Sequence, residues 1–332
     1  MPSKASTVSS YSSFSGIGIV LGPAERRQTI RDWSKAKPAT DAVYQIYKGM
    51  YADDRTPLNA KLESVAQDST DWRKEKITFD AAYGKERVTA YLFVPARVRP
   101  PYQTVVFVPS ARSLDIPSSQ ALTDMKFIDY VIQSGRAVVY PVYKGTYERT
   151  AAPPGPDTTA GRETLIQDSK DLGRSLDYLE TRTEFDPNRI AIMGESMGAA
   201  VEVYLAAVEE RVKAVIMLDG GFYSEKPLPG TDQVDFAPHI KAPTLLICGK
   251  FDWIFLGKDA LLRMLGAPAA DKKAVTFDTA HDVSEQRSDL VREVLAWLDK
   301  CGLQQLMRNY IDCCENSSDS CEGLTPSSRT FG

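Results

Sequence analysis

Residue 196 is a serine within the sequence Gly-Glu-Ser-Met-Gly, which covers residues 194–198. The apolar residues 189–193 before it are typical of a buried strand, and residues 199–209 after it favour a helix. A Gly-x-Ser-x-Gly pattern between a strand and a helix predicts a nucleophile elbow, a sharp turn that presents the serine hydroxyl at the carboxyl end of a sheet. Both glycines are needed because the strand and the helix approach closely there. Ser196 is therefore the candidate nucleophile.

A serine hydroxyl is a poor nucleophile at neutral pH, so it needs a general base, and the base needs a carboxylate that orients it. The chain contains two histidines, His239 and His281. Where a nucleophile elbow is present, the base follows the last strand of the sheet. His281 comes just after a predicted strand at residues 274–277, whereas His239 comes before a predicted strand at residues 244–248. We therefore expect His281 to be the base and His239 to be an ordinary loop residue.

The orienting acid is expected after the penultimate strand. Asp252 stands there, behind the predicted strand 244–248 and a glycine, in a turn that would aim its carboxylate at the loop of the base. Asp219 follows the preceding predicted strand and is the alternative acid. These positions predict a catalytic triad of Ser196, Asp252 and His281.

The tetrahedral intermediate of acyl transfer carries an oxyanion, which two backbone N–H groups can bind. Met197 directly follows the nucleophile and is expected to supply one of them. The other is expected from the loop after the predicted strand 102–109, where Ala111 is the first choice and Ser110 the fallback. Glu195 is expected to point away from the site and to take no part in the chemistry.

The sequence lacks the motifs and the net charge that several other classes of function require. The chain contains no glycine-rich phosphate loop followed by Lys-Ser/Thr and no His-Glu-x-x-His sequence, so we expect neither a cofactor nor a metal. The net charge of −4 argues against a nucleic-acid partner. No stretch approaches the ~20 apolar residues that span a bilayer, and the N-terminus does not resemble a secretory signal. Five scattered cysteines fit reduced thiols, so we expect a cytoplasmic protein.

Predicted strands alternate with predicted helices along most of the chain, which implies right-handed crossovers and a mostly parallel sheet. We expect an α/β-hydrolase fold with about eight strands, helices on both faces and no large cap domain. The first two strands, at residues 72–81 and 86–96, are expected to form an antiparallel hairpin at the edge of the sheet. The other expected strands cover residues 102–109, 137–142, 189–193, 212–218, 244–248 and 274–277, and the main helices cover residues 119–134, 162–183, 199–209 and 284–298.

The two ends of the chain are polar and show no periodic pattern. We expect residues 1–40 to form a poorly defined extension, residues 41–301 the hydrolase domain, and residues 302–332 a disordered tail. The loops 144–161 and 220–240 are expected to cover the active-site pocket and to limit the size of the acyl group.

Two segments resemble a known family. Residues 186–198 are similar to the elbow of the dienelactone hydrolase and prolyl-oligopeptidase-like branch of α/β hydrolases, and residues 242–252 are similar to its acid strand. Residues 54–60, 140–149 and 171–182 resemble an esterase-like module found at the C-terminus of some bacterial serine/threonine protein kinases. Over residues 41–300 the resemblance implies an esterase-like hydrolase, with Ser196, Asp252 and His281 on the matching positions. The chain departs from it in having no kinase motifs and no glycines in the loop 110–112.

The expected function is that of a bacterial serine carboxylic-ester hydrolase that acts through an acyl-enzyme on small, short-acyl esters. One alternative is a prolyl-oligopeptidase-like peptidase or amidase, although the chain has no room for the propeller domain of such peptidases. Another is a non-catalytic regulatory binding module. The expected partner is a small-molecule ester, and the sequence predicts no oligomeric state.

Overall fold

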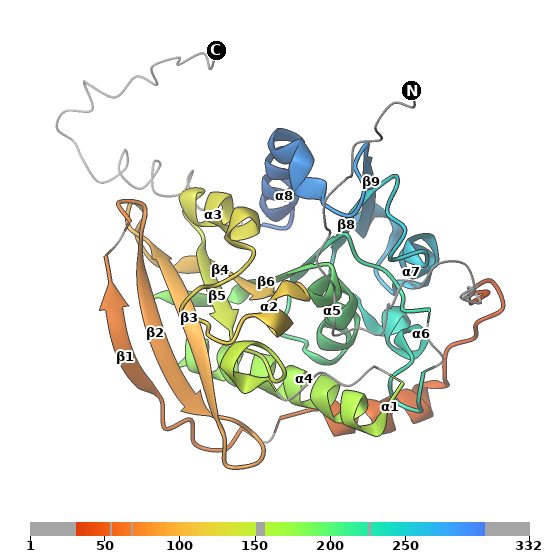
Figure 1. Ribbon diagram of the computed structural model, residues 1–332, viewed down its shortest axis with the longest axis horizontal. Coiled ribbons are helices and arrows are strands. Elements are labelled where there is room, and N and C mark those ends of the chain that lie inside the picture. The colour runs from red at the N-terminus through yellow and green to blue at the C-terminus, as the bar shows by residue number, and fades with distance from the viewer. Residues whose placement is uncertain (1–30, 54, 68, 151–156, 225–226, 303–332) are drawn as a thin grey trace, which may run out of the picture.

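The computed structural model describes residues 31–53, 55–67, 69–150, 157–224 and 227–302. Within these ranges nine strands form one sheet in the order β1-β2-β3-β5-β4-β6-β7-β8-β9 (Figure 1). β1, β2 and β3 are antiparallel to their neighbours, and β5, β4 and β6 to β9 run parallel to one another. The strands are β1 Lys61–Ala66, β2 Trp72–Asp80, β3 Arg87–Pro95, β4 Tyr102–Val108, β5 Ala137–Pro141, β6 Phe185–Glu195, β7 Ala214–Leu218, β8 Thr244–Gly249 and β9 Lys272–Phe277.

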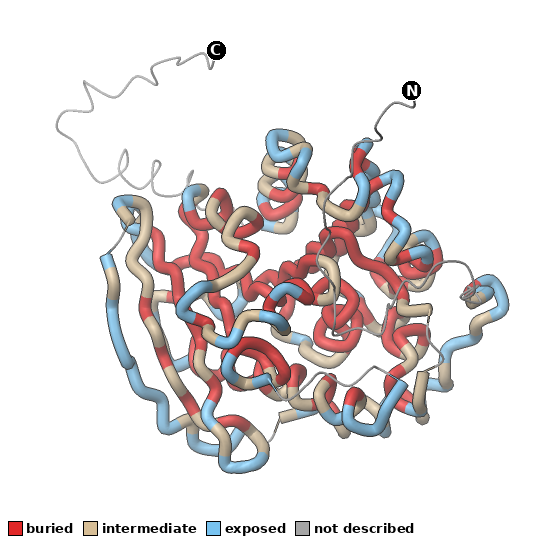
Figure 2. The backbone as a smooth tube through the Cα atoms, viewed as in Figure 1, coloured by how far each residue is buried: buried red, intermediate tan, exposed pale blue. Residues whose placement is uncertain are grey.

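Helices cover both faces of the sheet, as an α/β-hydrolase fold requires. One face carries α1, α4, α5, α6 and α7, and the other carries α3 and α8. The strands β4, β5, β7 and β8 are buried at every residue, because both of their faces are covered (Figure 2). The helices are α1 Asp41–Tyr51, α2 Arg112–Asp115, α3 Met125–Gln133, α4 Thr159–Glu180, α5 Met197–Val208, α6 Gln233–Phe236, α7 Lys258–Met264 and α8 Arg287–Lys300. The predicted fold class is confirmed.

The strand β1 was not predicted. Five of its six residues are exposed, so it lacks the apolar run or alternation by which a strand is recognised in a sequence. It exists because its backbone pairs antiparallel with β2 at the edge of the sheet. The predicted hairpin is confirmed as β2 and β3, one strand in from that edge.

The two ends of the chain lie mostly outside the described residues. Residues 31–40 pack on the domain, where Trp33 is buried and Arg31 forms an ion pair with Asp232. The expected tail begins at residue 302, the last described position. None of the helices in the described ranges is both long and apolar enough to cross a membrane.

Glu202 is a buried carboxyl group of α5. Its side chain is fully buried, and neither carboxyl oxygen has a hydrogen-bond partner among the residues that the structure describes. Burial raises its pKa well above the ordinary value of 4.5. The folded protein therefore keeps this proton to a higher pH than the unfolded chain does. Relative to its value below pH 4.5, the stability of the fold therefore falls as the pH rises toward the raised pKa.

We expect Glu202→Met to raise Tm at pH 8, by about 2–4 °C for each kcal/mol that the burial costs. The apolar side chain fills a similar volume and needs no proton. Thermal melts of both proteins at pH 5 and pH 8 test this, and the gain should be larger at pH 8. Glu202→Gln is the matched control, because it removes the ionisable group but keeps an unpaired polar one, so its gain should be smaller. Two variants that both melt below the wild type at pH 8 would show that the carboxyl group stabilises the fold.

Candidate active site

Ser196 lies at the turn between β6 and α5. Its φ of 55° and ψ of −114° are unusual for a residue with a side chain, which is the strained geometry of a nucleophile elbow. A Cβ on Gly198 would lie 2.1 Å from the carbonyl oxygen of Val108, and one on Gly194 would lie 2.6 Å from the backbone of Gly198. Only glycine fits at either position, so the two glycines of the motif are explained by close backbone contacts.

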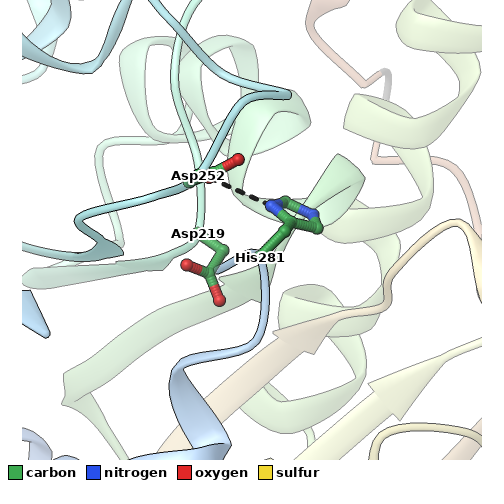
Figure 3. Close-up of side chains that lie close together, drawn as sticks. All are labelled: Asp219, Asp252 and His281. Carbon is green, nitrogen blue, oxygen red and sulfur yellow. Dashed lines mark hydrogen bonds and ion pairs between the residues drawn. The ribbon is translucent and has the colours of Figure 1, made fainter. Parts of the chain in front are cut away.

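The structure brings the three predicted triad residues together. The Ser196 Oγ atom lies 2.7 Å from Nε2 of His281. Nδ1 of His281 lies 3.0 Å from Oδ2 of Asp252 (Figure 3). The Asp252 side chain is fully buried, and its other oxygen accepts the Ile254 N–H at 2.8 Å. Hydrogen bonds thus hold both oxygens of the carboxylate. The imidazole can accept the proton of the serine hydroxyl while Asp252 keeps it oriented.

Asp252 lies in the turn after β8, residues 250–254, which we call the acid turn. His281 lies in the loop after β9, residues 278–283, which we call the base loop. Backbone contacts between the two hold this arrangement. The N–H groups of Lys250 and Phe251 donate to the carbonyl oxygens of Phe277 and Thr279. A Cβ on Gly249 would lie 1.8 Å from the carbonyl oxygen of Ala280, so the base loop passes directly over this glycine. The loop after β8 and the loop after β9 therefore form one packed unit.

Asp219, the alternative acid, does not hydrogen-bond to the imidazole. It follows β7 and accepts the N–H of Gly249 at 3.0 Å and the N–H of Val283 at 2.8 Å. Burial raises its pKa to about 6, although both hydrogen bonds and the nearby His281 oppose the rise. Figure 3 shows its carboxylate directed away from the imidazole, toward which Asp252 points.

Asp219, Asp252 and His281 are also the cluster in the described ranges whose ligand atoms are close enough together to hold a metal ion, within 4.8 Å. Each of those atoms already takes part in a hydrogen bond within the protein. The donor set is therefore arranged as a hydrogen-bonded network rather than as an open coordination site.

The structure distinguishes between the two predicted oxyanion donors of the loop after β4. The Ser110 N–H donates to Oδ2 of Asp124 at 2.9 Å, so this fallback donor is occupied. The Ala111 N–H has no acceptor in the described part of the chain. Met197 is the first residue of α5, where the N–H groups are not used by the helix. The close approach of Gly198 to Val108 places the start of α5 beside the loop after β4.

Sequence reasoning missed Asp124, which holds the loop of the predicted oxyanion donors through the Ser110 N–H. It falls inside the predicted helix 119–134, where nothing distinguishes it from a helix residue. In the structure it precedes α3 with a φ of 62°. Glu195 is buried, and this burial together with the carboxyl groups of Asp124 and Asp219 raises its pKa well above the ordinary range. No hydrogen bond within the described ranges joins Glu195 to the triad.

Aromatic side chains form a wall beside the base. The ring centroids of Phe255 and His281 are 5.9 Å apart, and those of Tyr223 and Phe255 are 5.8 Å apart. Tyr223 belongs to the loop that was expected to cover the pocket, while residues 151–156 of the other expected loop lie outside the described ranges. His239 stacks on Tyr44 of α1, with 3.4 Å between ring centroids.

The profile of the Dienelactone hydrolase family matches residues 88–282, which is more than half of the chain. The chain belongs to this family. The matched segment contains all of β3 except Arg87, the strands β4 to β9, the elbow, the acid turn and His281. The predicted resemblance to dienelactone hydrolases is confirmed. A search of curated proteins found no significant sequence match.

Solved structures with a similar fold include several esterases. An acetyl xylan esterase from Paenibacillus sp. R4 has a TM-score of 0.60 and 19% identity, over 79% of this chain and 96% of that one. Acetyl xylan esterase 1 from Thermoanaerobacterium sp. JW/SL YS485 has a TM-score of 0.59 and 14% identity, over 80% and 95%. A putative dienelactone hydrolase from Klebsiella pneumoniae has a TM-score of 0.51 and 20% identity, over 68% and 98%. At these identities the likeness shows the fold, and the family assignment shows a hydrolase.

Proposed function

We propose that this dienelactone hydrolase family member is a serine carboxylic-ester hydrolase with Ser196, His281 and Asp252 as its triad. The observation that carries the proposal is the unbroken hydrogen-bonded chain from Ser196 Oγ through the imidazole to Asp252, with distances of 2.7 and 3.0 Å. The family contains hydrolases, and this chain has a serine at the apex of its elbow. The reaction requires no group beyond the side chains and backbone of the site.

In the acylation step, Nε2 of His281 takes the hydroxyl proton while Ser196 Oγ bonds to the carbonyl carbon of the ester. The carbonyl oxygen becomes an oxyanion, which accepts hydrogen bonds from the N–H groups of Met197 and Ala111. Asp252 stabilises the imidazolium that forms. The intermediate then collapses, the bond to the leaving oxygen breaks, and His281 returns the proton to the departing alcohol.

In the deacylation step, a water molecule takes the place of the alcohol. His281 removes a proton from the water as the water oxygen bonds to the acyl carbon, and a second oxyanion forms in the same hole. When this intermediate collapses, Ser196 leaves and recovers its proton from His281. The products are a carboxylic acid and the free enzyme, so the cycle balances without a cofactor.

We expect short acyl groups to be preferred, because Phe255 lies beside His281, Tyr223 packs on Phe255, and no large domain caps the site in the described part of the chain. For p-nitrophenyl esters, kcat/KM should fall by about tenfold or more between acetate and octanoate, since a pocket distinguishes methylene groups by ~1–3 kcal/mol each. Hydrolysis rates over acyl lengths from two to about ten carbons test this, with Ser196→Ala as the background. A rate that rises with acyl length would contradict the short-acyl preference but not the ester hydrolase.

Two neighbours in fold are acetyl xylan esterases, and removal of an acetyl group from a carbohydrate fits the proposed small acyl pocket. The proposal also includes a bacterial enzyme of the carboxylesterase class and a cytoplasmic location. Free thiols at Cys248 and Cys301 support the location. The resemblance to a kinase-associated esterase-like module belongs to the proposal as well.

If the fold served only as a regulatory binding module, a fluorophosphonate probe would fail to label Ser196 and esters would not be turned over.

A further inference from the structure

Asp219 is a buried acid at the centre of the site that the proposed reaction does not use. It lies at the carboxyl end of β7, between the elbow strand β6 and the acid strand β8. Its side chain is inaccessible to solvent, and its φ is 49°. The left-handed region is costly for most residues with a side chain, but aspartate and asparagine tolerate it best. An acid kept in such a position needs a reason beyond filling space.

The two oxygens of Asp219 bind to two different loops. Oδ1 accepts the N–H of Gly249, which ends β8 three residues before Asp252. Oδ2 accepts the N–H of Val283, which follows His281 by two residues. A single carboxylate therefore joins the turn that carries the acid to the loop that carries the base. Its bonds to the protein satisfy backbone donors that would otherwise be buried without partners.

We propose that Asp219 is a positioning residue that holds the loops of Asp252 and His281 at the separation their hydrogen bond requires. The proposal rests on the proposed function, because it concerns the same triad. No hydrogen bond joins Asp219 to Ser196 in the described ranges, and Asp219 acts through the two loops. A displacement of the imidazole by about 1 Å can lower the rate ~100-fold, so a link of this kind has a large effect on turnover.

The link depends on the charge of the carboxylate. An ionised carboxylate accepts both N–H groups, whereas a protonated one places a hydrogen on one of its oxygens. Burial raises the pKa of Asp219 to about 6, so this change falls within the range in which an enzyme can be assayed. The ionisable groups that act on it are Asp252, His281, Glu195 and Cys248. Burial raises the pKa of Cys248 to about 12, so this thiol stays protonated throughout.

The test compares Asp219→Asn with the wild type. Asparagine keeps the shape and tolerates the backbone conformation, but it offers one acceptor oxygen in place of two. At pH 8 we expect kcat for p-nitrophenyl acetate to fall about 10- to 100-fold, with KM changed less than about threefold. The ratio of wild-type to variant kcat should shrink as the pH falls below about 6, because the wild type then also loses an ionised carboxylate.

Two further variants separate the carboxylate from its surroundings. Asp219→Gly relieves any backbone strain and should still lose at least as much activity as Asp219→Asn. Asp278→Asn is the matched control: it removes an exposed carboxylate of the base loop that pairs with Lys250, and its kcat should stay within about twofold of the wild type. Glu195 is the other acid of the site with a raised pKa, so the comparison is repeated in a Glu195→Gln background. The ratio of kcat for Glu195→Gln to kcat for the double variant with Asp219→Asn should show the same pH dependence.

Amide hydrogen exchange gives a readout that does not depend on activity. Peptides that contain residues 249–253 and 281–284 should exchange faster in Asp219→Asn than in the wild type, while those of β4 and β5 should be unchanged. An Asp219→Asn enzyme with wild-type kcat, a kcat ratio that stays constant with pH, or unchanged exchange in both loops would each overturn the proposal. A wild-type protein that hydrolyses no ester would refute the proposed function instead, and the exchange data would still report on the link.

Discussion

Ser196→Ala should lower kcat/KM for p-nitrophenyl acetate by at least about 10⁴-fold, to near the uncatalysed rate, because no acyl-enzyme can form without the hydroxyl. The other parts of the site remain in place, but binding and oxyanion stabilisation alone recover only a small part of the acceleration. Steady-state rates at pH 8, corrected for spontaneous hydrolysis, measure the loss. We expect this to be the largest effect of any single substitution in the chain.

The Ser196→Ala protein should remain folded. Alanine and serine share the same Cβ, so the strained turn imposes the same steric demands on both, and Tm should stay within a few degrees of the wild type. Ser64→Ala, at an exposed position of β1, is the control for loss of a hydroxyl group and should keep full activity. A fluorophosphonate probe should label the wild type at Ser196 and leave the variant unlabelled. Retained turnover in the variant would refute Ser196 as the nucleophile.

The grouping of Ser196, Asp252 and His281 could be predicted because most of its evidence is local and ordered along the chain. Gly194 reports a close backbone contact with Gly198, four residues away, whereas the contact that requires glycine at 198 is with the distant Val108. His281 was singled out by elimination between two histidines, and Asp252 by its place after a strand. The alternative acid, Asp219, could not be dismissed from sequence, because its hydrogen bonds to Gly249 and Val283 span 30 and 64 residues of chain. Only the folded sheet shows that its oxygens are already occupied.

The predicted helix 119–134 was too long for a related reason. Its apolar spacing is helical, but the structure begins α3 at Met125. The N–H and hydroxyl groups of Ser119 donate to Glu148, and the Thr123 N–H donates to the hydroxyl oxygen of Tyr147. These bonds to a distant loop hold the preceding residues out of the helix. Tertiary hydrogen bonds of this kind override a local pattern, and the same rule explains why the role of Asp124 was missed.

Asp252→Asn should lower kcat/KM by about 10³- to 10⁴-fold at pH 7, the loss expected when the orienting acid of such a triad becomes an amide. The carboxylate now accepts a hydrogen bond from Nδ1 of His281 and leaves Nε2 free to take the serine proton. An amide can present its own N–H₂ group to Nδ1. That group favours the tautomer with the hydrogen on Nε2, which cannot accept the proton from Ser196.

Comparison with Asp219→Asn decides which acid serves the base. Both aspartates are buried within the same cluster, and both substitutions remove one negative charge close to His281. A purely electrostatic role would therefore give two losses of similar size. Of the two, only Asp252 binds Nδ1 of His281. Its substitution removes a direct contact with the base, whereas that of Asp219 removes only a contact with the two loops. The Asp252 variant should therefore lose at least about tenfold more activity. The reverse order would make Asp219 the catalytic acid and Asp252 the residue that positions the loops.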